Sequence, residues 1–171
     1  MSDADPPGVA ASIDPKRFRE VLSNYPTGVC VVTAQTDAGQ RLGLVVGSFT
    51  SISLDPPLVG FFPDRRSTTW PRIEDTGRFC VNVLASHQNE LSGRFTARNS
   101  ERFGELAHDT SPAGLPLLKE TVAWIDCRID RVIEVGDHFL VVGAVEALGP
   151  GDERDPLLFF RGGYHALAPL D

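Results

Sequence analysis

The chain has 171 residues, 42% of them hydrophobic, which predicts a single domain with a substantial buried core. Its net charge of −7 argues against binding to the phosphate backbone of a nucleic acid, because such proteins normally present a basic face. The three cysteines, Cys30, Cys80 and Cys127, are widely spaced in apolar segments, which argues against a disulfide framework and favours buried, reduced thiols.

Residues 1–13 consist mainly of small residues and prolines and are expected to form a flexible tail. This segment has neither the basic region nor the apolar stretch of a signal peptide. No apolar run approaches the roughly 18 residues that a membrane helix needs. We therefore expect a cytoplasmic protein that does not bind a membrane.

A helix is predicted from Asp14, which has the side chain of an N-cap and is followed by Pro15, a residue favoured in the first turn. Pro26 is expected to end it. Four apolar residues recur at helical spacing and predict that one face packs inward: Phe18, Val21, Leu22 and Tyr25.

Strands follow. Residues 29–36 are rich in β-branched side chains and lead into a hairpin turn at 37–40. Residues 41–54 are predicted to form one long second strand, in which Gly43 and Gly47 mark bends or the close approach of another group.

The second strand is expected to end at Asp55, because two prolines follow and proline cannot donate to a strand ladder. Residues 58–62 are predicted to be a third, buried strand. Residues 67–75 are predicted to be a short helix interrupted by a proline, and residues 79–84 a further strand.

Ser86 is expected to cap another helix, and residues 99–120 are loop-rich. Residues 122–135 are predicted to form a long strand whose alternation slips near Arg131, which indicates a bulge. Gly136 and Asp137 are predicted to turn the chain back.

Two strands, at residues 139–148 and 157–160, complete the pattern. Six or more mostly hairpin-linked strands with two or three short helices predict a mainly β protein, as a closed or partly closed antiparallel barrel. We find no repeat or linker that divides the chain, so residues 14–171 are expected to form one domain.

Most standard active sites are absent from the sequence. The four histidines lack metal-ligand spacing, so no metal site is predicted. There is no GxSxG nucleophile motif, no cysteine in an evident reactive setting, and neither a GxGxxG nor a GxxxxGKS/T phosphate loop.

An unusual hydroxyl-rich segment remains, at residues 47–58. Its sequence, GSFTSISLDPPL, places four hydroxyl groups within six residues and ends in two prolines. Hydroxyls and free backbone N–H groups suit a flat heteroaromatic ligand with a ribityl-phosphate tail. The alternative is a half-exposed strand whose Ser and Thr side chains face water.

Two further clusters carry possible chemistry. Arg66, Ser67 and Thr68 stand near a predicted helix N-terminus, which suits a phosphate, although a solvated turn with a capping serine explains them as well. His138 follows a turn and is either a surface residue or a catalytic one.

Taken together, these segments resemble the flavin reductase-like domain family, the small reductase components of two-component aromatic hydroxylases and related monooxygenases. The resemblance covers about residues 16–167 and depends on the order and spacing of its segments. They are YPTGV (25–29), GSFTSISLDPPL (47–58), RST (66–68), FCVNVL (79–84), the segment 88–95, GDH (136–138) and RGGY (161–164).

The resemblance implies a split antiparallel β-barrel of FMN-binding topology, usually a homodimer with the flavin near the subunit interface. It also implies that NADH or NADPH reduces FMN or FAD, and that a partner monooxygenase consumes the reduced flavin. Hydride transfer between these cofactors needs no catalytic triad or metal, so their absence is expected.

The resemblance also assigns site residues. The isoalloxazine and ribityl chain are expected to lie along Val46, Gly47, Ser48, Phe49, Thr50, Ser51 and Ser53. The phosphate is expected at Arg66, Ser67 and Thr68, the nicotinamide near His138 as the one catalytic candidate, and Tyr164 is expected to close the pocket. Val45-Val46-Gly47 departs from the Thr-Ala-Ser or Thr-Ala-Asn of many relatives, which leaves the preference between FMN and FAD open.

Two alternatives stay open on the sequence. One is a different enzyme on the same barrel, such as a pyridoxamine-phosphate-oxidase-like or corrin-reducing protein. The other is a non-catalytic flavin carrier. The Gly136-Asp137-His138 segment favours the reductase, because a carrier needs no nicotinamide side.

Overall fold

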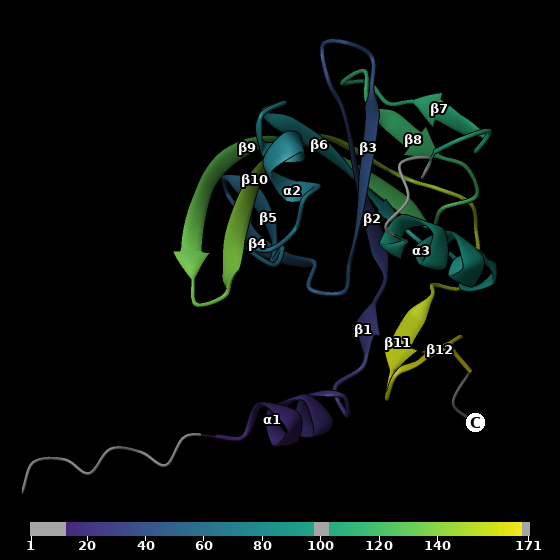
Figure 1. Ribbon diagram of the computed structural model, residues 1–171. Coiled ribbons are helices and arrows are strands. Elements are labelled where there is room, and N and C mark those ends of the chain that lie inside the picture. Colours follow the sequence, from purple (N-terminus) through teal and green to yellow (C-terminus); the bar gives the residue numbers. More distant parts are fainter. Residues whose placement is uncertain (1–12, 98–102, 169–171) are drawn as a thin grey trace, which may run out of the picture.

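The computed structural model describes residues 13–97 and 103–168, and within these ranges strands predominate and the helices are short (Figure 1). The predicted mainly β class with short helices is therefore confirmed. The predicted flexible tail lies, apart from Ile13, outside the described residues.

Helix α1 (Pro15–Leu22) begins as predicted, because the Asp14 carboxylate accepts hydrogen bonds from the N–H groups of Lys16 and Arg17, each at 3.2 Å. The prediction that one face packs inward is wrong for the single chain. None of the helix residues is buried, and Phe18 is 54% exposed. Helix α1 lies apart from the main sheet, beside the end of β1 (Thr27–Gly28), and within the described part of the chain its apolar face is left largely exposed (Figure 1).

Strand β2 (Cys30–Gln35) occupies the predicted position and pairs with β3 (Arg41–Val46) through the predicted hairpin. Alternate residues of a strand point to opposite faces, and both faces of β2 are buried. Val32 lies in the main core, while Val31 packs under helix α3 (Asn89–Thr96). This double burial explains the nearly continuous apolar run in the sequence.

The predicted long strand at 41–54 is instead two strands, β3 and β4 (Thr50–Leu54), separated by residues 47–49. The break has a topological cause, because β3 pairs with β2 whereas β4 pairs with β5 (Pro57–Phe61). Gly43 and Gly47 are both sites of close approach, as predicted. A Cβ at Gly43 would overlap the Phe95 ring, and one at Gly47 would lie 3.0 Å from the Thr27 hydroxyl.

Helix α2 (Trp70–Glu74) is shorter than predicted, with Pro71 in its first turn rather than as an interruption. Its Trp70 and Ile73 are fully buried in the main core. Strand β6 (Arg78–Val83) is followed by the 3-10 turn η1 (Ser86–Gln88) and α3. Capping differs from the prediction, because Gln88 rather than Ser86 accepts the N–H of Ala85, at 2.9 Å.

The segment predicted as loop-rich contains the short hairpin β7 (His108–Thr110) and β8 (Pro116–Leu118). Buried polar groups fasten it to the main sheet. The Asn82 side chain accepts the Leu118 N–H at 2.8 Å and donates to the Thr33 hydroxyl at 3.0 Å, and that hydroxyl donates to the Pro116 carbonyl at 2.6 Å.

Strands β9 (Ala123–Val135) and β10 (His138–Pro150) form a long antiparallel hairpin with a turn at Gly136, where φ is 61°. The predicted bulge near Arg131 is confirmed. Val142 pairs with Arg131 but Gly143 pairs with Ile129, which leaves Asp130 as the extra residue. The C-terminal strand was predicted as 157–160 and is β11 (Leu158–Phe160), which pairs with β12 (Gly163–His165) and β1.

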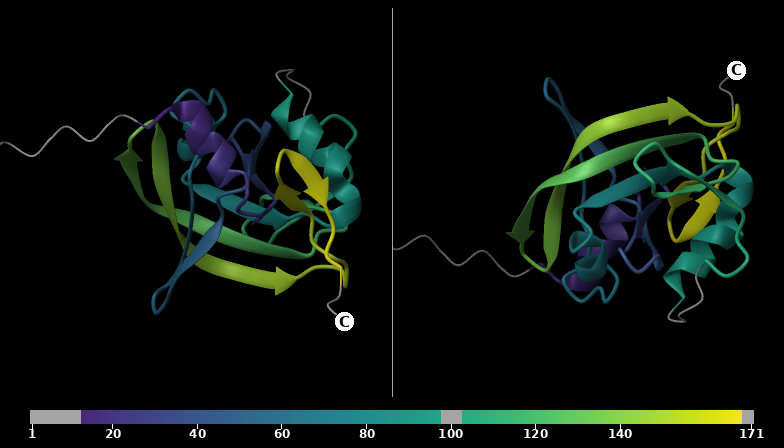
Figure 2. Two further views of the ribbon diagram at one scale, coloured as in Figure 1. Left: turned by 90° about the horizontal axis from the view of Figure 1, so that it is seen from below. Right: turned by 90° about the horizontal axis from the view of Figure 1, so that it is seen from above.

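The main sheet has seven strands in the order β3-β2-β6-β9-β10-β5-β4. Hydrogen bonds do not close it into a barrel, because β3 and β4 are its two edges. The sheet is nevertheless strongly curved, with α2 against its inner side (Figures 1 and 2). The inner core includes the ring of Phe61, which makes edge contacts with Trp70 at 5.6 Å and Phe79 at 5.3 Å between centroids.

Candidate functional site

A corner of the molecule joins two segments that are far apart in the sequence. The Arg65 N–H donates to the Asp137 carbonyl, and the Phe139 N–H donates to the Pro63 carbonyl, both at 3.0 Å. These bonds pair Asp64 with His138 in an antiparallel bridge. The Arg66 cluster and the Gly136-Asp137-His138 segment, predicted separately, therefore form one local unit.

Asp64 and Arg66 form the main ion pair of this corner. Nη2 of Arg66 lies 2.8 Å from Oδ2 of Asp64, and both Nε and the backbone N–H of Arg66 donate to Oδ1. These hydrogen bonds from Arg66 hold the pKa of the Asp64 carboxyl well below its usual value. The Arg66 side chain is still 86% exposed, so its guanidinium is open to a ligand.

His138 is oriented by its neighbour. Its Nδ1 lies 2.7 Å from Oδ1 of Asp137, and the hydrogen bond from His138 lowers the pKa of the Asp137 carboxyl. Within the described residues, Nε2 of His138 has no hydrogen-bond partner. A ring fixed at Nδ1 presents Nε2 as the atom that can meet a ligand.

Ser67 and Thr68 have different roles. Oγ of Ser67 accepts the N–H of Trp70 at 3.1 Å and that of Thr69 at 3.3 Å, so it caps the start of α2 as the structural alternative proposed. Neither the hydroxyl nor the N–H of Thr68 has a partner in the described part of the chain. Thr68 is thus the freer of the two donors.

A pocket of about 830 Å³, called here the Thr68 pocket, lies on one side of the ion pair. Its polar lining includes the Arg66 guanidinium and four hydroxyl-bearing side chains, while β3 and α3 supply an apolar wall. It has the chemistry that a phosphorylated heteroaromatic ligand needs. It is lined by Leu44, Val45, Asp64, Arg66, Ser67, Thr68, Thr69, Phe95 and Thr96.

A second pocket of about 590 Å³, called here the His138 pocket, borders the same ion pair. It lies between α1 and the corner described above. It is lined by Ile13, Pro15, Phe18, Arg19, Asp64, Arg66, Asp137 and His138. Asp64 and Arg66 therefore belong to both pockets.

The hydroxyl-rich segment lies outside both pockets in the single chain. Ser48 accepts the Phe62 N–H at 2.9 Å, Phe49 packs against the main core, and Val46 is 6% exposed within that core. Thr50 and Ser51 are exposed on the edge strand β4. The structure thus brings Arg66, Ser67 and Thr68 together with Val45, but not with residues 47–53.

Tyr164 also lies outside both pockets. Its hydroxyl is 2.9 Å from the Ser92 hydroxyl on α3, and its ring makes an edge contact with Phe159, with centroids 5.5 Å apart. These contacts tie β12 to the helix that supplies Phe95 and Thr96 to the Thr68 pocket. Tyr164 is still 41% exposed.

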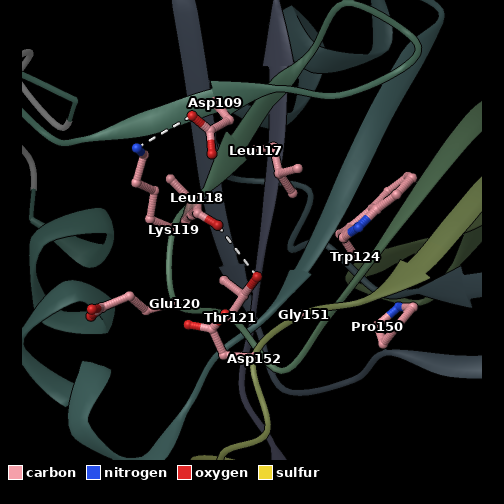
Figure 3. Close-up of a pocket in the computed structure, with 10 residues that line it drawn as sticks. All are labelled: Asp109, Leu117, Leu118, Lys119, Glu120, Thr121, Trp124, Pro150, Gly151 and Asp152. Atoms are coloured by element: carbon pink, nitrogen blue, oxygen red, sulfur yellow. Dashed lines mark hydrogen bonds and ion pairs between the residues drawn. The ribbon is translucent and has the colours of Figure 1, made fainter.

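A further pocket, of about 400 Å³, lies where β9 begins and β10 ends, at the opposite end of the hairpin from His138 (Figure 3). Its charged groups are already paired. Lys119 lies 3.4 Å from Asp109, and Arg154 interacts with both Glu120 and Asp152. None of the predicted site residues lines it.

Three further properties of the described part of the chain concern metal ligands, membrane-spanning helices and thiols. No group of three His, Cys, Asp or Glu side chains there is arranged to hold a metal ion. No described helix has both the length and the apolar character to cross a membrane. The three thiols are free and buried, as predicted, and burial raises the pKa of Cys30 and of Cys127 to about 12.

The sequence interpretation missed the apolar walls of both pockets. Phe95 was not singled out as a site residue, and Phe18 was expected only to pack inward. Arg19 carried no signal beyond an ordinary surface charge. These residues approach the pockets from helices whose placement depends on long-range packing, so no local pattern could have identified them.

Comparisons with known proteins identify the family of the chain. Residues 22–168 match the family model described as "Flavin reductase like domain". A flavin reductase from Pseudomonas putida is 49% identical over 162 residues, covering 95% of each chain. The flavin-dependent monooxygenase reductase subunit HsaB from Rhodococcus jostii (strain RHA1) is 42% identical over 171 residues, covering 99% of this chain and 87% of HsaB.

A solved structure has a fold similar to that of this chain. The crystal structure of a nitrilotriacetate monooxygenase component B homologue from Mycobacterium thermoresistibile superposes with a TM-score of 0.86 at 41% identity, covering 90% of this chain and 87% of that chain. Two further relatives are named as an FMN reductase (NADH) and an NADH-dependent flavin reductase.

Proposed function

The chain belongs to the flavin reductase-like domain family and is a flavin reductase, and we propose that it binds its two substrates on either side of the Asp64–Arg66 ion pair. As an oxidoreductase it uses NADH to reduce FMN or FAD, and it supplies the reduced flavin to a partner monooxygenase. The observation that carries the assignment of the site is this ion pair, shared by two pockets.

The flavin phosphate is assigned to the Thr68 pocket. Arg66 supplies a charge-assisted donor, and Thr68 supplies a hydroxyl and an N–H without partners among the described residues. Ser67 shapes the loop by capping α2. The apolar side chains of Val45 and Phe95 suit the carbon skeleton of the ligand.

The isoalloxazine ring is assigned to the end of β3 and to the hydroxyl-rich segment: Val46, Gly47, Ser48, Phe49, Thr50, Ser51 and Ser53. Val46 follows Val45 of the Thr68 pocket in the chain, and residues 47–49 lead from it to the edge strand β4, so the ligand is proposed to extend from that pocket along this segment. Only residues 47–49 separate the two edges of the sheet, which supports a split antiparallel barrel. Tyr164, held against α3, is the candidate for closing the site.

The nicotinamide is assigned to the His138 pocket. Asp137 fixes the His138 ring through Nδ1, so Nε2 can donate to or accept from the carboxamide of the coenzyme. The hydride transfer itself is chemistry that nicotinamide and flavin supply between them. The chain contributes by holding the two rings close together.

We also propose a homodimer. Helix α1 leaves a large part of its apolar side chains in solvent, and the edge strand β4 exposes Leu54 at 94% and Ile52 at 46%. Exposed apolar surface on this scale is typical of an interface. A second copy that covers α1 would complete the site at its rim.

The buried free thiols support a cytoplasmic location, because reduced cysteines are typical of that compartment. The family match over residues 22–168 supports one domain across residues 14–171. The cytoplasmic location and the single domain are therefore part of the proposal.

The direct test mixes the purified protein with NADH and an excess of FMN or FAD and follows nicotinamide absorbance. We expect oxidation well above the blank that contains flavin alone. Oxidation at the blank rate with both flavins would contradict the proposed activity.

The site assignment is tested by Arg66→Ala with Arg65→Ala as its matched control. Arg65 is adjacent but lines neither pocket, and it pairs with Glu134 at 3.4 Å. We expect Arg66→Ala to weaken flavin binding about tenfold or more, with less effect on turnover at saturating flavin. Equal affinities in the two variants, by fluorescence titration, would remove Arg66 from the site.

His138→Ala addresses the other pocket. We expect it chiefly to raise the KM for NADH, since the side chain is assigned to the coenzyme and not to the flavin phosphate. An unchanged KM would remove His138 from the nicotinamide site.

A further inference from the structure

The His138 pocket has one wall that the family resemblance did not lead us to expect, namely helix α1. Phe18 and Pro15 give this wall an apolar surface, and Arg19 adds a positive charge. The opposite wall is the corner that carries Asp64 and His138. A ligand in this pocket thus meets an aromatic ring and cationic groups together.

Arg19 differs from the other arginines that the structure describes. In residues 13–97 and 103–168, every other arginine has an ion pair or hydrogen bond through its guanidinium. The Arg19 guanidinium has none within the same ranges. It therefore lies at the edge of a pocket with its full hydrogen-bonding capacity unused.

We propose that Arg19 binds the diphosphate of the nicotinamide dinucleotide and so makes α1 part of the NADH site. The inference rests on the proposed function and adds to it the residue that recognises the non-reacting half of the coenzyme. A guanidinium is the side chain best suited to phosphate, because its planar fork donates two parallel hydrogen bonds. The apolar surface of Phe18 and Pro15 suits a base or nicotinamide ring.

Charge in the pocket favours this position. Arg66 is already held by Asp64, and the second carboxylate, Asp137, is bound to His138. Of the two arginines that line the pocket, only Arg19 is therefore free of a carboxylate. A diphosphate near α1 would meet an unneutralised cation, whereas one near the corner would meet Asp64 and Asp137 as well.

The test compares Arg19→Ala with Arg17→Ala, which removes the same charge from the same helix. Arg17 pairs with Glu20 at 3.2 Å and does not line the pocket. With saturating FMN, which has no diphosphate, we expect Arg19→Ala to raise the KM for NADH about tenfold with little change in kcat. Arg17→Ala should stay close to the wild type, and Arg19→Lys should restore part of the loss.

A second substrate separates phosphate recognition from a general disturbance of the helix. N-benzyl-1,4-dihydronicotinamide donates a hydride but carries no phosphate. We expect its KM to be the same in Arg19→Ala and in the wild type. A parallel rise for both reductants would contradict a role for Arg19 in binding the diphosphate.

Other outcomes overturn the inference in distinguishable ways. Equal KM values for NADH in the Arg19 and Arg17 variants remove Arg19 from the site. A loss of affinity for FAD but not for FMN, with an unchanged KM for NADH, assigns Arg19 to the flavin diphosphate. A changed oligomeric state with an unchanged KM assigns it to a subunit interface. A wild type that does not oxidise NADH overturns the proposed function as well.

Discussion

Strand β2 and helix α1 are both predicted correctly as elements, but they end in opposite environments. Val31, Val32 and Ala34 of β2 are completely buried, whereas α1 contains no buried residue. Both segments carry regular apolar patterns. The difference shows that periodicity identifies an element and its apolar face, while what covers that face depends on the rest of the chain or on another molecule.

The sharpest contrast comes from removing one phenylalanine from each region. Phe61 is completely buried between Trp70 and Phe79, so Phe61→Ala should lower the free energy of unfolding by about 3–5 kcal/mol. Phe18→Ala on α1 should cost less than about 1 kcal/mol in the dilute monomer. Urea denaturation followed by circular dichroism measures both.

Similar losses in the two phenylalanine variants would contradict the contrast. If Phe61→Ala does not fold, Phe61→Leu provides a milder change at the same position. It should still destabilise the protein more than Phe18→Ala does.

The second contrast uses two asparagines. Asn82 is completely buried and bonds to Thr33 and Leu118, so Asn82→Ala leaves buried groups without partners and should cost about 2–3 kcal/mol. Asn24, just after α1, bonds only at the surface, and Asn24→Ala should cost less than about 1 kcal/mol. Thermal unfolding with matched heat-capacity corrections gives both values, and a larger loss for Asn24→Ala would reverse the ranking.

The third test asks whether a second copy covers α1. Leu22 is 50% exposed, and Leu22→Glu should raise the dissociation constant of the proposed homodimer at least about tenfold, because a buried leucine contributes about 1.5–3 kcal/mol. Light scattering after gel filtration measures the mass. Lys16→Glu, a charge change on the same helix, is the control and should leave the dimer intact. A wild type that is monomeric at high concentration would refute the dimer itself.

The smallest expected effect concerns pH. The pKa of Asp64 is lowered by Arg66, so the ion pair stabilises the folded state above the unfolded pKa of about 3.9 and is lost as pH falls through the lower folded value. Asp64→Asn should therefore have a thermal midpoint that falls less steeply below about pH 4 than that of the wild type. The effect should be small because the pair is exposed to solvent. If the thermal midpoints of the two proteins fall in parallel with pH, the Asp64–Arg66 ion pair contributes nothing to stability.

Local signals predicted most of the fold. The Asp14-Pro15 start of α1 and the bulge beside Arg131 were correct because each depends on neighbouring residues. The break at Gly47 was missed, since the composition on both sides suits a strand and only the change of partner from β2 to β5 ends β3. The inward packing of α1 was predicted wrongly for a similar reason, because local periodicity does not show which surface covers an apolar face.

The candidate site was predictable only in part, because its local motifs are visible in the sequence whereas the contacts between them are long-range. Arg66 and His138 stood out as separate motifs, and their junction required the pairing of residues 63–65 with 137–139. The ion pair between Asp64 and Arg66 was not predicted from the sequence. The placement of Phe95 in the Thr68 pocket depends on how α3 packs across Gly43, a contact that no local pattern encodes.

The Asp64–Arg66 pair also has a thermodynamic consequence. Because the pair lies on the boundary between two pockets, an anion that draws the guanidinium toward the Thr68 pocket leaves a less neutralised carboxylate facing the His138 pocket. Occupancy on one side then alters affinity on the other, and linkage requires the change to be equal in both directions. On the proposed assignment of the two substrates, each would act as an effector of the other through this shared ion pair.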